Sequence, residues 1–335
     1  MPHKRVCEAC LPIGRQEALT IIFELIGVVH TMIITVTLNP SIDRTIAVDD
    51  FAINSVRKGE LMMCVPGGKG INVSRAVKAL GGNTRALIIT GGITGELIER
   101  KLREEYIDFT SLNIGNRSSR TCYGIIDRKN RTETIINELG PELTLSDMEM
   151  FKNLCRENIS KGDIVAISGS APRGVGGDYY RELVDIAKER GAMVLVDTSG
   201  ENLRHAVEAS PFIVKVNAEE MSRLISGDIS METVSPLLKK GIYAVIVTHG
   251  SSPLLVFYGE KLLKVKPPSV EVVNSWGCGD CFVAGLLFYI QNGYTLEEAV
   301  KFGTATAAAN TLSYGAGFIK RDDVLRLLDE VEFVN

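Results

Sequence analysis

The sequence predicts an α/β fold built on a mostly parallel, buried β-sheet. From Met32 onward, short apolar runs alternate with longer segments of helical periodicity. The apolar runs are continuous, as in strands that are covered on both faces. Each run is followed by Gly, Asn, Ser or Pro, which are residues that end strands. Such an alternation is typical of βαβ units.

Six apolar runs are the candidate strands of this sheet, and the segments between or after them are candidate helices. The strands are expected at Ile33–Leu38, Arg85–Thr90, Ile164–Ser168, Met193–Val196, Phe212–Val216 and Ala244–Thr248. The helices are expected at Ile71–Leu80, Gly95–Glu104, Ser146–Ser160, Asp178–Arg190, Ala218–Ile225, Met231–Lys240, Cys281–Gln291, Leu296–Leu312 and Asp322–Val331.

Two segments, at about residues 44–64 and 121–137, depart from this alternation. Their polar residues recur as in half-exposed strands, and a turn near Asp127–Asn130 would close the second segment into a hairpin. We expect them to form a small separate sheet that acts as a lid or pairs with a second subunit. No internal repeat or low-complexity linker is visible, so residues 32–335 are predicted to form one domain with this insertion.

The composition limits the classes of function. The chain has 335 residues, 45% of them hydrophobic and 23% charged, which is enough for a sizeable core. A formal net charge of −4 leaves no general excess of basic residues for a phosphate backbone, so a dedicated nucleic-acid binder is not expected. The seven cysteines are spread over a long chain, which favours a reducing cytoplasm over secretion. No apolar run reaches the length of a membrane span.

The first 31 residues differ from the rest of the chain. They combine a basic start, a short apolar run and the pair Cys7 and Cys10. A signal peptide would need a small-residue cleavage pattern, and a zinc finger would need a second Cys/His pair at finger spacing. The sequence has neither, so we interpret residues 1–31 as an appendage to a domain that begins near Met32.

A glycine-rich turn precedes the first predicted helix, where Pro66–Asn72 reads Pro-Gly-Gly-Lys-Gly-Ile-Asn. Glycines let backbone amides approach a ligand closely, and the N-terminus of a helix favours an anion. The spacing is not that of a Walker A loop. From these residues alone, a ligand-binding turn and a plain connection between strand and helix both remain open.

A second pair of glycines lies in the segment Gly277-Cys278-Gly279-Asp280, just before the predicted helix Cys281–Gln291. Such a turn can direct consecutive N–H groups at one point, where they could hold the charge of a transferred phosphoryl group. An isolated Asp at a helix start is most simply an N-cap. Beside an anion hole, however, the carboxylate of Asp280 could accept the proton of an attacking hydroxyl.

Together these motifs resemble those of the PfkB, or ribokinase-like, carbohydrate kinases, within them the 1-phosphofructokinase and tagatose-6-phosphate kinase branch. The resemblance extends over Met32–Asn335 and also rests on Asn39-Pro40-Ser41-Ile42-Asp43, Ser168-Gly169-Ser170 and Asn217-Ala218-Glu219-Glu220. It implies a ribokinase-like three-layer α/β/α fold with a small β-sheet lid. It also implies ATP-dependent phosphorylation of an alcohol group on a sugar phosphate.

The resemblance implies roles for individual residues. Those implied to bind the sugar phosphate are Asp43, Gly68, Lys69, Asn72 and Arg120. Of these, Lys69 and Arg120 are the candidates for the phosphate already on the substrate, since Arg suits bidentate contact and Lys supplies a point charge. Those implied in catalysis are Asp280, as the base, and Gly277, Cys278 and Gly279, as the anion hole.

The resemblance further implies ATP and Mg²⁺ as cofactors. The residues implied to bind ATP are Lys215, Asn217, Glu220, Thr248, Gly250 and Asn310. Asn217 and Glu220 would also organise Mg²⁺ through water, in keeping with the reluctance of Mg²⁺ to lose its waters. The expected partners are a small sugar phosphate, ATP and a second copy of the chain bound through the lid, with no nucleic acid and no membrane.

Two positions depart from the family pattern. Cys278 stands where Ala or Ser is usual, and this change should be tolerated because the anion hole uses a backbone N–H. Pro253 lies where relatives commonly have a second glycine in the nucleotide loop, which removes an amide donor and puts nucleotide affinity in question. Cys278 and Cys281 form a C-x-x-C at a helix start, which could lower a thiol pKa and support a redox switch, although small residues also simply fit there.

The predicted reaction is phosphorylation of a ketohexose phosphate. Fructose 1-phosphate, giving fructose 1,6-bisphosphate, is the first choice, followed by tagatose 6-phosphate, giving tagatose 1,6-bisphosphate, and then fructose 6-phosphate. Lys69 and the segment Asn137–Pro141 are shared by the first two groups and do not separate them.

Two other classes of protein are alternatives to a sugar-phosphate kinase. A sugar-phosphate-binding regulator without catalysis would need neither the base Asp280 nor the pair Asn217 and Glu220. A nicotinamide-dependent dehydrogenase would need G-x-G-x-x-G directly after the first strand, where this chain has Leu38-Asn39-Pro40-Ser41.

Overall fold

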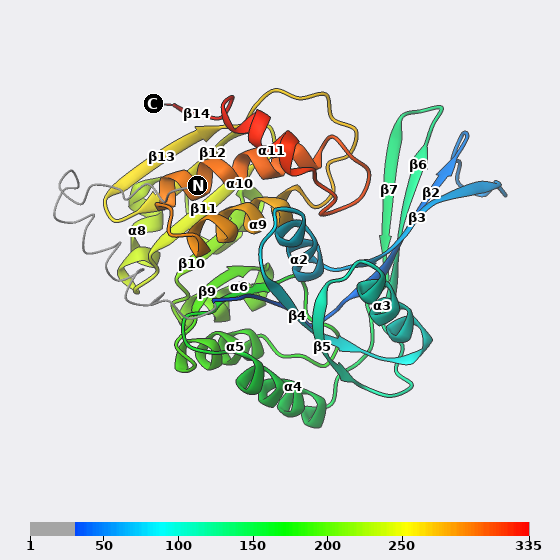
Figure 1. Ribbon diagram of the computed structural model, residues 1–335, viewed down its shortest axis with the longest axis horizontal. Helices are drawn as coiled ribbons and strands as arrows, with labels where there is room; N and C mark the ends of the chain where they lie inside the picture. Colours follow the sequence, from blue (N-terminus) through cyan, green and yellow to red (C-terminus); the bar gives the residue numbers. More distant parts are fainter. Residues whose placement is uncertain (1–30, 335) are drawn as a thin grey trace, which may run out of the picture.

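The computed structural model describes residues 31–334, and its main feature is a ten-stranded sheet between two layers of helices (Figure 1). In spatial order the strands are β14 (Glu332–Val334), β13 (Lys261–Lys266), β12 (Ser252–Tyr258), β11 (Ala244–His249), β10 (Ile213–Asn217), β9 (Met193–Asp197), β8 (Ile164–Ser168), β1 (Ile33–Thr37), β4 (Thr84–Thr90) and β5 (Asp108–Asn113). The strands from β11 to β5 are parallel, and β12, β13 and β14 form an antiparallel edge. The prediction of a mostly parallel sheet is confirmed. The predicted appendage, residues 1–31, lies outside the described residues apart from Thr31.

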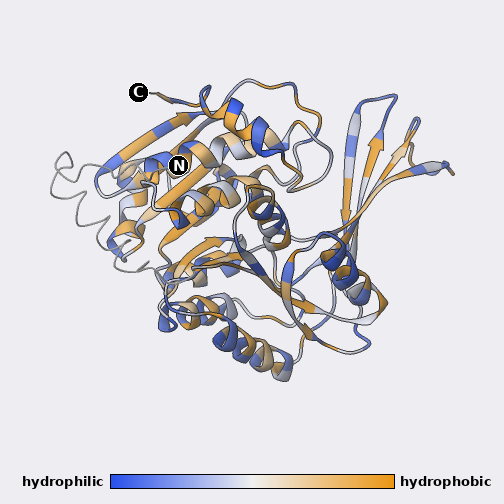
Figure 2. Ribbon diagram, viewed as in Figure 1, coloured by the Kyte–Doolittle hydropathy of each residue, from blue (hydrophilic) through white to orange (hydrophobic). Residues whose placement is uncertain are grey.

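The two faces of the sheet support two separate apolar cores. In β8, for example, Ile164 and Ala166 belong to one core, and Val165 and Ile167 to the other. Because successive side chains in a strand point to opposite faces, a strand covered on both sides must be apolar throughout. This explains the continuous apolar runs of the sequence, and Figure 2 shows the strands as the hydrophobic centre of the molecule.

One face is covered by α4 (Leu145–Asn158), α5 (Asp178–Glu189), α6 (Gly200–Glu208), α7 (Ala218–Leu224) and α8 (Met231–Lys239). The other face is covered by α2 (Lys69–Ala79), α9 (Cys278–Gln291), α10 (Leu296–Asn310) and α11 (Arg321–Leu328), with α3 (Gly92–Glu104) beside them. The three-layer α/β/α arrangement is therefore confirmed.

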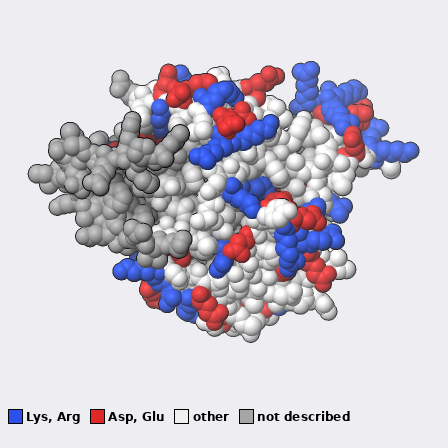
Figure 3. Space-filling view, viewed as in Figure 1, with Lys and Arg blue, Asp and Glu red and all other residues white. Residues whose placement is uncertain are grey.

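A second sheet projects from one side of the main body, and we call it the lid sheet (Figure 1). Its four strands lie in the order β3 (Gly59–Gly67), β2 (Ser41–Val48), β6 (Arg120–Asp127) and β7 (Thr132–Asn137). These strands lie in and around the two segments, at about residues 44–64 and 121–137, that break the alternation of predicted strands and helices. All of β7 and the first four residues of β3 are exposed. On the face shown in Figure 3, acidic and basic side chains are interspersed over the main body.

Helices α9 and α10 pack so closely that glycines are required where they cross. A Cβ atom on Gly285 would lie 2.9 Å from the Cα of Gly303 and against the side chain of Thr306. A Cβ atom on Gly303 would lie 2.8 Å from the carbonyl oxygen of Phe282. Helix α9 begins with Cys278, Gly279 and Asp280, so this crossing fixes where these residues stand.

We predict that Gly285→Ala lowers the free energy of unfolding by about 1–3 kcal/mol, because the added methyl group must push two helices apart. Thermal unfolding followed by circular dichroism measures the change. Gly176→Ala is the matched control, since a Cβ atom there meets nothing within 4 Å. Equal melting temperatures for Gly285→Ala and the parent protein would contradict the tight crossing.

Candidate active site

Polar residues gather where the parallel strands end. Strands β1, β8, β9 and β10 end at Thr37, Ser168, Asp197 and Asn217, and parallel strands place these ends along one edge of the sheet. The chain continues from β1 through β4 and β5 on one side and then returns to β8 on the other. Ligands of open α/β sheets bind at such a reversal of strand order. The site is therefore expected outside the ends of β1 and β8.

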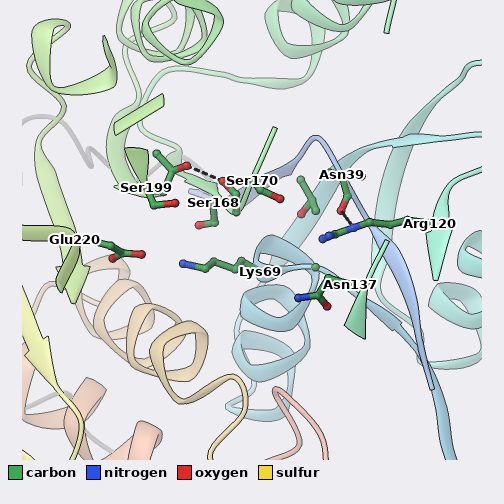
Figure 4. A pocket seen from close by; sticks show the side chains of 12 residues that line it. Asn39, Lys69, Arg120, Asn137, Ser168, Ser170, Ser199 and Glu220 are labelled. Carbon is green, nitrogen blue, oxygen red and sulfur yellow. Dashed lines mark hydrogen bonds between the residues drawn. The ribbon is translucent and has the colours of Figure 1, made fainter. Parts of the chain in front are cut away.

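A cavity of about 220 Å³ lies at this reversal, and we call it the Lys69 cavity (Figure 4). It is lined by Thr37, Asn39, Gly68, Lys69, Arg120, Asn137, Ser168, Gly169, Ser170, Thr198, Ser199 and Glu220. Among the described residues, the hydroxyls of Thr37 and Ser168 and the side-chain amide oxygen Oδ1 of Asn39 are buried without a hydrogen-bond partner. Buried polar groups are normally paired. Three unpaired groups in one cavity indicate that it is built to bind a polar ligand.

The glycine-rich turn forms one wall of this cavity. Gly68 is the N-cap of α2 with φ of 114°, a conformation that favours glycine, and its Cβ atom would lie 2.8 Å from the Thr37 side chain. A side chain on Gly67 would collide with the carboxylate of Asp43. That carboxylate accepts a hydrogen bond of 2.6 Å from the hydroxyl of Ser41, and burial raises its pKa.

Arg120 lies opposite α2, on the first residue of β6 (Figure 4). Its Nε donates to the main-chain carbonyl oxygen of Asn39 over 3.1 Å, and its Nη1 donates to the main-chain carbonyl oxygen of Glu138 over 3.4 Å. The side chains of Lys69 and Arg120 thus line the same cavity from the main body and from the lid sheet. The structure brings together the two cations that the sequence assigned to a substrate phosphate.

Asp197 joins two lysines in the centre of the site. Its Oδ1 accepts a hydrogen bond of 2.9 Å from Lys69 Nζ, and its Oδ2 accepts one of 3.2 Å from Lys215 Nζ. Burial alone would raise the pKa of Asp197, but Lys215 and Lys69 outweigh it and hold that pKa below its ordinary value. Burial opposes the charge of Lys69, and Asp197 reverses this and raises the lysine pKa. The bridge therefore keeps two cations in place inside the protein.

Asp280 stands beside this bridge, at the third position of α9. The pKa of Asp280 is raised from 3.8 to about 6. Burial is the largest cause and nearby Asp197 adds to it, whereas Lys69, Asn72 and Lys215 oppose the rise. Asn72 Nδ2 donates to Asp280 Oδ2 over 2.8 Å. A carboxyl group that is charged near neutral pH but holds its proton more readily than usual has the properties of a general base.

The loop before α9 takes a shape that glycine allows. Gly277 is the N-cap with φ of 74°, and a Cβ atom there would lie 2.7 Å from the Cα of Ala316. A Cβ atom on Gly279 would lie 2.7 Å from Lys215 Nζ. The first amides of α9 have no partner within the helix and carry the positive end of its dipole. Gly277, Cys278 and Gly279 thus place amides next to Lys215 and Asp280.

A larger cavity of about 660 Å³ lies on the other side of this loop, and we call it the Thr248 cavity. It is lined by Thr248, His249, Gly250, Ser251, Ser252, Leu254, Lys266, Pro267, Pro268, Ser269, Val270, Val272, Ser275, Cys278, Gly279, Phe282, Thr304, Ala307, Ala308 and Thr311. Its wall is mainly apolar on the α10 side and polar at the end of β11. Thr248 and Gly250, which the sequence assigned to the nucleotide, both line it. Pro253, the departure from the family pattern, lies in β12.

Asn217 and Glu220 form the start of α7. The Asn217 side chain accepts from the Glu220 N–H over 2.8 Å, and the Glu220 side chain accepts from the Asn217 N–H over 2.8 Å. This reciprocal capping box uses one oxygen of each side chain. Within the described part of the chain, the second carboxylate oxygen of Glu220 makes no hydrogen bond. The residue lines the Lys69 cavity and points toward Lys69 (Figure 4). The pair has oxygen ligands of the kind that Mg²⁺ prefers, in a place where water could intervene.

Asn310 differs from its expected role. It was expected to face the nucleotide, but it is fully buried and lies outside the wall of the Thr248 cavity. Its Nδ2 donates to the carbonyl oxygen of Trp276 over 2.6 Å, and its Oδ1 accepts from the Gly317 N–H over 2.9 Å. Both amide ends are engaged by the chain itself, so Asn310 supports the loop before α9.

The two thiols on α9 decide between the two interpretations of the C-x-x-C. The helix start could have lowered the pKa of Cys278, but burial raises it. Burial likewise raises the pKa of the Cys281 thiol well above its ordinary value, and that thiol donates to Asn310 Oδ1 over 3.2 Å. A thiol that resists ionisation is a poor nucleophile. The raised pKa values do not support the alternative of a redox switch and favour the interpretation that small residues simply fit at these positions.

Sequence reasoning missed several residues of the site, above all Asp197. Asp197 directly follows the predicted strand Met193–Val196, and an acidic residue at the end of a buried parallel strand is a usable signal. Ser168 and Ser170 were part of the family resemblance but were given no role. Thr37 and Asn137 could not be assigned, because their proximity depends on how the lid sheet meets the main sheet.

The lid sheet touches the loop before α9. A Cβ atom on Gly124 of β6 would overlap the indole ring of Trp276. A Cβ atom on Gly315 would lie 2.7 Å from the sulfur of Met63 on β3. The lid sheet therefore contacts both Trp276, which precedes Gly277, and the segment that contains Ala316.

The sequence is similar to those of sugar-phosphate kinases. It is 35% identical over 308 residues to 1-phosphofructokinase of Bacillus subtilis (strain 168), covering 90% of this chain and 99% of that protein. It is 30% identical over 311 residues to tagatose-6-phosphate kinase of Staphylococcus epidermidis, again covering 90% of this chain and 99% of the relative.

The fold is also shared with a solved kinase. Phosphofructokinase-2 from Escherichia coli, in complex with substrates and products, superposes with a TM-score of 0.84 at 27% identity, covering 89% of this chain and 99% of that one. The same protein has been solved in a tetrameric inhibited form. The sequence model of the pfkB family carbohydrate kinases matches residues 36–322. With this match over most of the chain, the protein belongs to the pfkB family of carbohydrate kinases and is a phosphotransferase.

Proposed function

We propose that the protein transfers the γ-phosphoryl group of ATP to a hydroxyl of a ketohexose phosphate, with fructose 1-phosphate as the first candidate substrate. One observation carries the proposal. Asp280 directly follows Gly279, which lines the Thr248 cavity, and it lies beside the bridge of Lys69, Asp197 and Lys215. Of the two lysines, Lys69 lines the Lys69 cavity, and Lys215 lies next to Gly279.

In this proposal the sugar phosphate occupies the Lys69 cavity. Lys69 and Arg120 bind its phosphate, and Asp43, Gly68 and Asn72 border the sugar. The unpaired hydroxyls of Thr37 and Ser168 offer further hydrogen bonds to the sugar phosphate. Buried groups that lack a partner in the protein give specificity, because a ligand that fails to pair them loses affinity.

ATP would occupy the Thr248 cavity, with its base against the apolar wall from α10 and its phosphates toward Lys215 and Gly279. Mg²⁺ would be held through water by Glu220 and Asn217 and would offset the repulsion between phosphate groups. The helix N-terminus at Gly277 and the lysines provide a positive environment for the transferred group.

The chemical step is an in-line displacement. The hydroxyl oxygen of the sugar forms a bond to the γ-phosphorus, the bond from that phosphorus to the bridging oxygen of ATP breaks, and ADP leaves with the electron pair. Asp280 accepts the hydroxyl proton, and the amides of Gly277, Cys278 and Gly279 stabilise the charge on the phosphoryl oxygens. The lid sheet would exclude water, which could otherwise accept the phosphoryl group.

The order of candidate substrates follows the relatives. The relative named 1-phosphofructokinase is 35% identical, whereas that named tagatose-6-phosphate kinase is 30% identical. We therefore place fructose 1-phosphate before tagatose 6-phosphate, and fructose 6-phosphate third. The reaction is proposed to take place in the cytoplasm, where the thiols of Cys64, Cys122, Cys155, Cys278 and Cys281 would stay reduced.

We also propose a homodimer through the lid sheet. Leu61 and Met62 on β3 and Ile135 and Ile136 on β7 are between 40% and 54% exposed. Neighbouring residues of a strand point to opposite faces, so both faces of the lid sheet present apolar side chains. One face could cover the substrate and the other could bind a second copy.

For the reaction, we predict ADP release with MgATP and fructose 1-phosphate, measured in a coupled assay beside tagatose 6-phosphate and fructose 6-phosphate. Asp280→Asn should lower kcat by roughly 10²–10⁴-fold, because the general base is lost. Turnover of none of the three sugars, with binding intact, would favour a regulator without catalysis. Undiminished turnover by Asp280→Asn would exclude Asp280 as the base.

For stability, we predict that Asp280→Asn unfolds at a higher temperature than the parent protein at about pH 8. Folding raises the pKa of this carboxyl from 3.8 to about 6, so ionised Asp280 destabilises the fold above pH 6. This penalty shrinks as the pH falls from about 6 to about 4 and is absent below. The free energy of unfolding of Asp280→Asn should exceed that of the parent protein by on the order of 1–3 kcal/mol at about pH 8, and this difference should vanish near pH 4.

Calorimetry across this pH range measures the effect, and Asp197→Asn is its control. Folding lowers the pKa of Asp197, so its charge stabilises the fold above its unfolded pKa and this stability is lost in acid. Asp197→Asn should therefore lower the melting temperature at about pH 8. If Asp280→Asn raises the melting temperature by the same amount at about pH 4 and at about pH 8, the raised pKa of Asp280 is contradicted.

For assembly, we predict that the parent protein sediments as a dimer and that Ile135→Lys shifts it toward monomer, because a charge would enter the apolar contact. Sedimentation equilibrium makes the comparison. Ile93→Lys is the matched control, since Ile93 on α3 is 83% exposed and lies outside the lid sheet. Equal masses for Ile135→Lys and the parent dimer would place the interface elsewhere.

A further inference from the structure

Arg75, on α2, is a buried arginine that no role in the reaction explains. It is 6% exposed, and each of its five N–H groups has an acceptor. Nε donates to Glu105 Oε2 over 2.7 Å, and Nη2 donates to Glu105 Oε1 over 3.3 Å and to the carbonyl oxygen of Pro66 over 2.5 Å. Nη1 donates to Asn72 Oδ1 over 2.9 Å and to the carbonyl oxygen of Ala316 over 2.8 Å.

The contact with Asn72 determines which way that amide faces. A guanidinium group only donates hydrogen bonds, so the Asn72 atom that faces Arg75 must be the oxygen. The atom that faces Asp280 is then the nitrogen, and it donates to Asp280 Oδ2 over 2.8 Å. Rotation of the amide by 180° would set a donor against a donor at Arg75 and, when Asp280 is charged, an acceptor against an acceptor at Asp280.

We propose that Arg75 is a positioning residue for the base. Arg75 binds the side-chain oxygen Oδ1 of Asn72, so that the side-chain nitrogen of Asn72 donates to Asp280. This hydrogen bond favours the charged carboxylate, which is the form that accepts the hydroxyl proton. The inference rests on the proposed function of Asp280 as the base. It adds that contacts from Glu105 through Arg75 and Asn72 orient the group that donates to Asp280.

The other contacts of Arg75 fix the same site from two further sides. Pro66 lies at the end of β3, where the lid sheet joins α2. Ala316 packs against Gly277, the N-cap of α9. The Phe318 ring lies over the guanidinium group, 4.7 Å from ring centre to Cζ. One planar group with five fixed donors can serve all these partners at once, which a lysine cannot.

The pKa of Asp280 depends on several neighbours besides Asn72. The titratable groups that face it are Lys69 on α2, Asp197 on β9, Lys215 on β10, and the thiols of Cys278 and Cys281 on its own helix. A test of Arg75 must keep these five neighbouring residues and must measure the ionisation of Asp280 itself. Substitutions at Arg75 alone keep all five residues.

The experiment compares pH profiles of kcat/KM for Arg75→Met and Arg75→Lys with that of the parent protein. Met removes the donors and the charge, and Lys retains the charge without the planar fork. In both variants we expect the acidic limb to move up by about one pH unit, which is roughly a tenfold loss on the acidic side. The ionisation of the substrate phosphates is common to all proteins compared and cancels in the difference.

Two controls separate positioning from a merely structural role. Arg85→Met makes the same chemical change at an ion pair between Arg85 Nε and Asp108 Oδ2 of 2.8 Å, on the β4 and β5 side of the sheet. It should leave the acidic limb in place. In an Asn72→Ala background, Arg75→Lys should no longer move the limb, because the link to Asp280 is already absent.

Titration of ¹³C-labelled Asp side chains by NMR measures the Asp280 pKa without turnover, with Asp280→Asn to assign the signal. We expect a higher Asp280 pKa in folded Arg75→Lys than in the parent protein. If no sugar phosphate is turned over but this shift is found, the proposed function fails and the positioning role stands. An unchanged Asp280 pKa and acidic limb in folded Arg75→Lys and Arg75→Met would overturn the inference.

Discussion

Two lysines from different elements share one buried carboxylate, and the arrangement of the site depends on this bridge. Asp197 holds Lys69, from the start of α2, and Lys215, from β10, within 2.9 and 3.2 Å. Without the carboxylate, the buried Lys215 ammonium would lose its ion pair, at a cost of several kcal/mol. With it, Lys69 supplies positive charge to the Lys69 cavity, and Lys215 supplies it beside Gly279 of the Thr248 cavity. Asp280 can then remain partly ionised although it is buried, because both lysines favour its charged form.

Close backbone approach is the second constraint. Gly277 meets Ala316, Gly279 meets Lys215, and Gly124 of the lid sheet meets Trp276. Any side chain at these positions would displace the loop before α9. Asn310 supports the same loop from beneath through the carbonyl oxygen of Trp276. The loop before α9 is therefore held by the main body, by the lid sheet and by the segment around Ala316.

Much of the fold and part of the site could be predicted from the sequence. The six buried parallel strands are continuous apolar runs, which is a local signal, and each corresponds to a strand of the main sheet. Strands β12 and β13 pair as a tight hairpin, with Tyr258 opposite Lys261, and they were missed because Pro253, Lys261 and Lys264 interrupt their apolar runs. The glycine motifs located α2 and α9, but the roles of Asp197, Arg75 and Asn310 depend on contacts between distant segments. A local sequence pattern cannot indicate that Asp197 lies between Lys69 and Lys215, because the three residues are far apart in the chain.

The central claim is that a sugar phosphate and ATP meet at Asp280. A crystal structure with MgADP, a phosphoryl-group mimic and fructose 1-phosphate tests it most directly. The account predicts the sugar phosphate in the Lys69 cavity, with its phosphate on Lys69 and Arg120, and its reacting hydroxyl within about 3 Å of an Asp280 oxygen. The nucleotide should lie in the Thr248 cavity, with its terminal phosphate in line. A sugar bound elsewhere, or a hydroxyl that no oxygen of Asp280 reaches, would contradict the account.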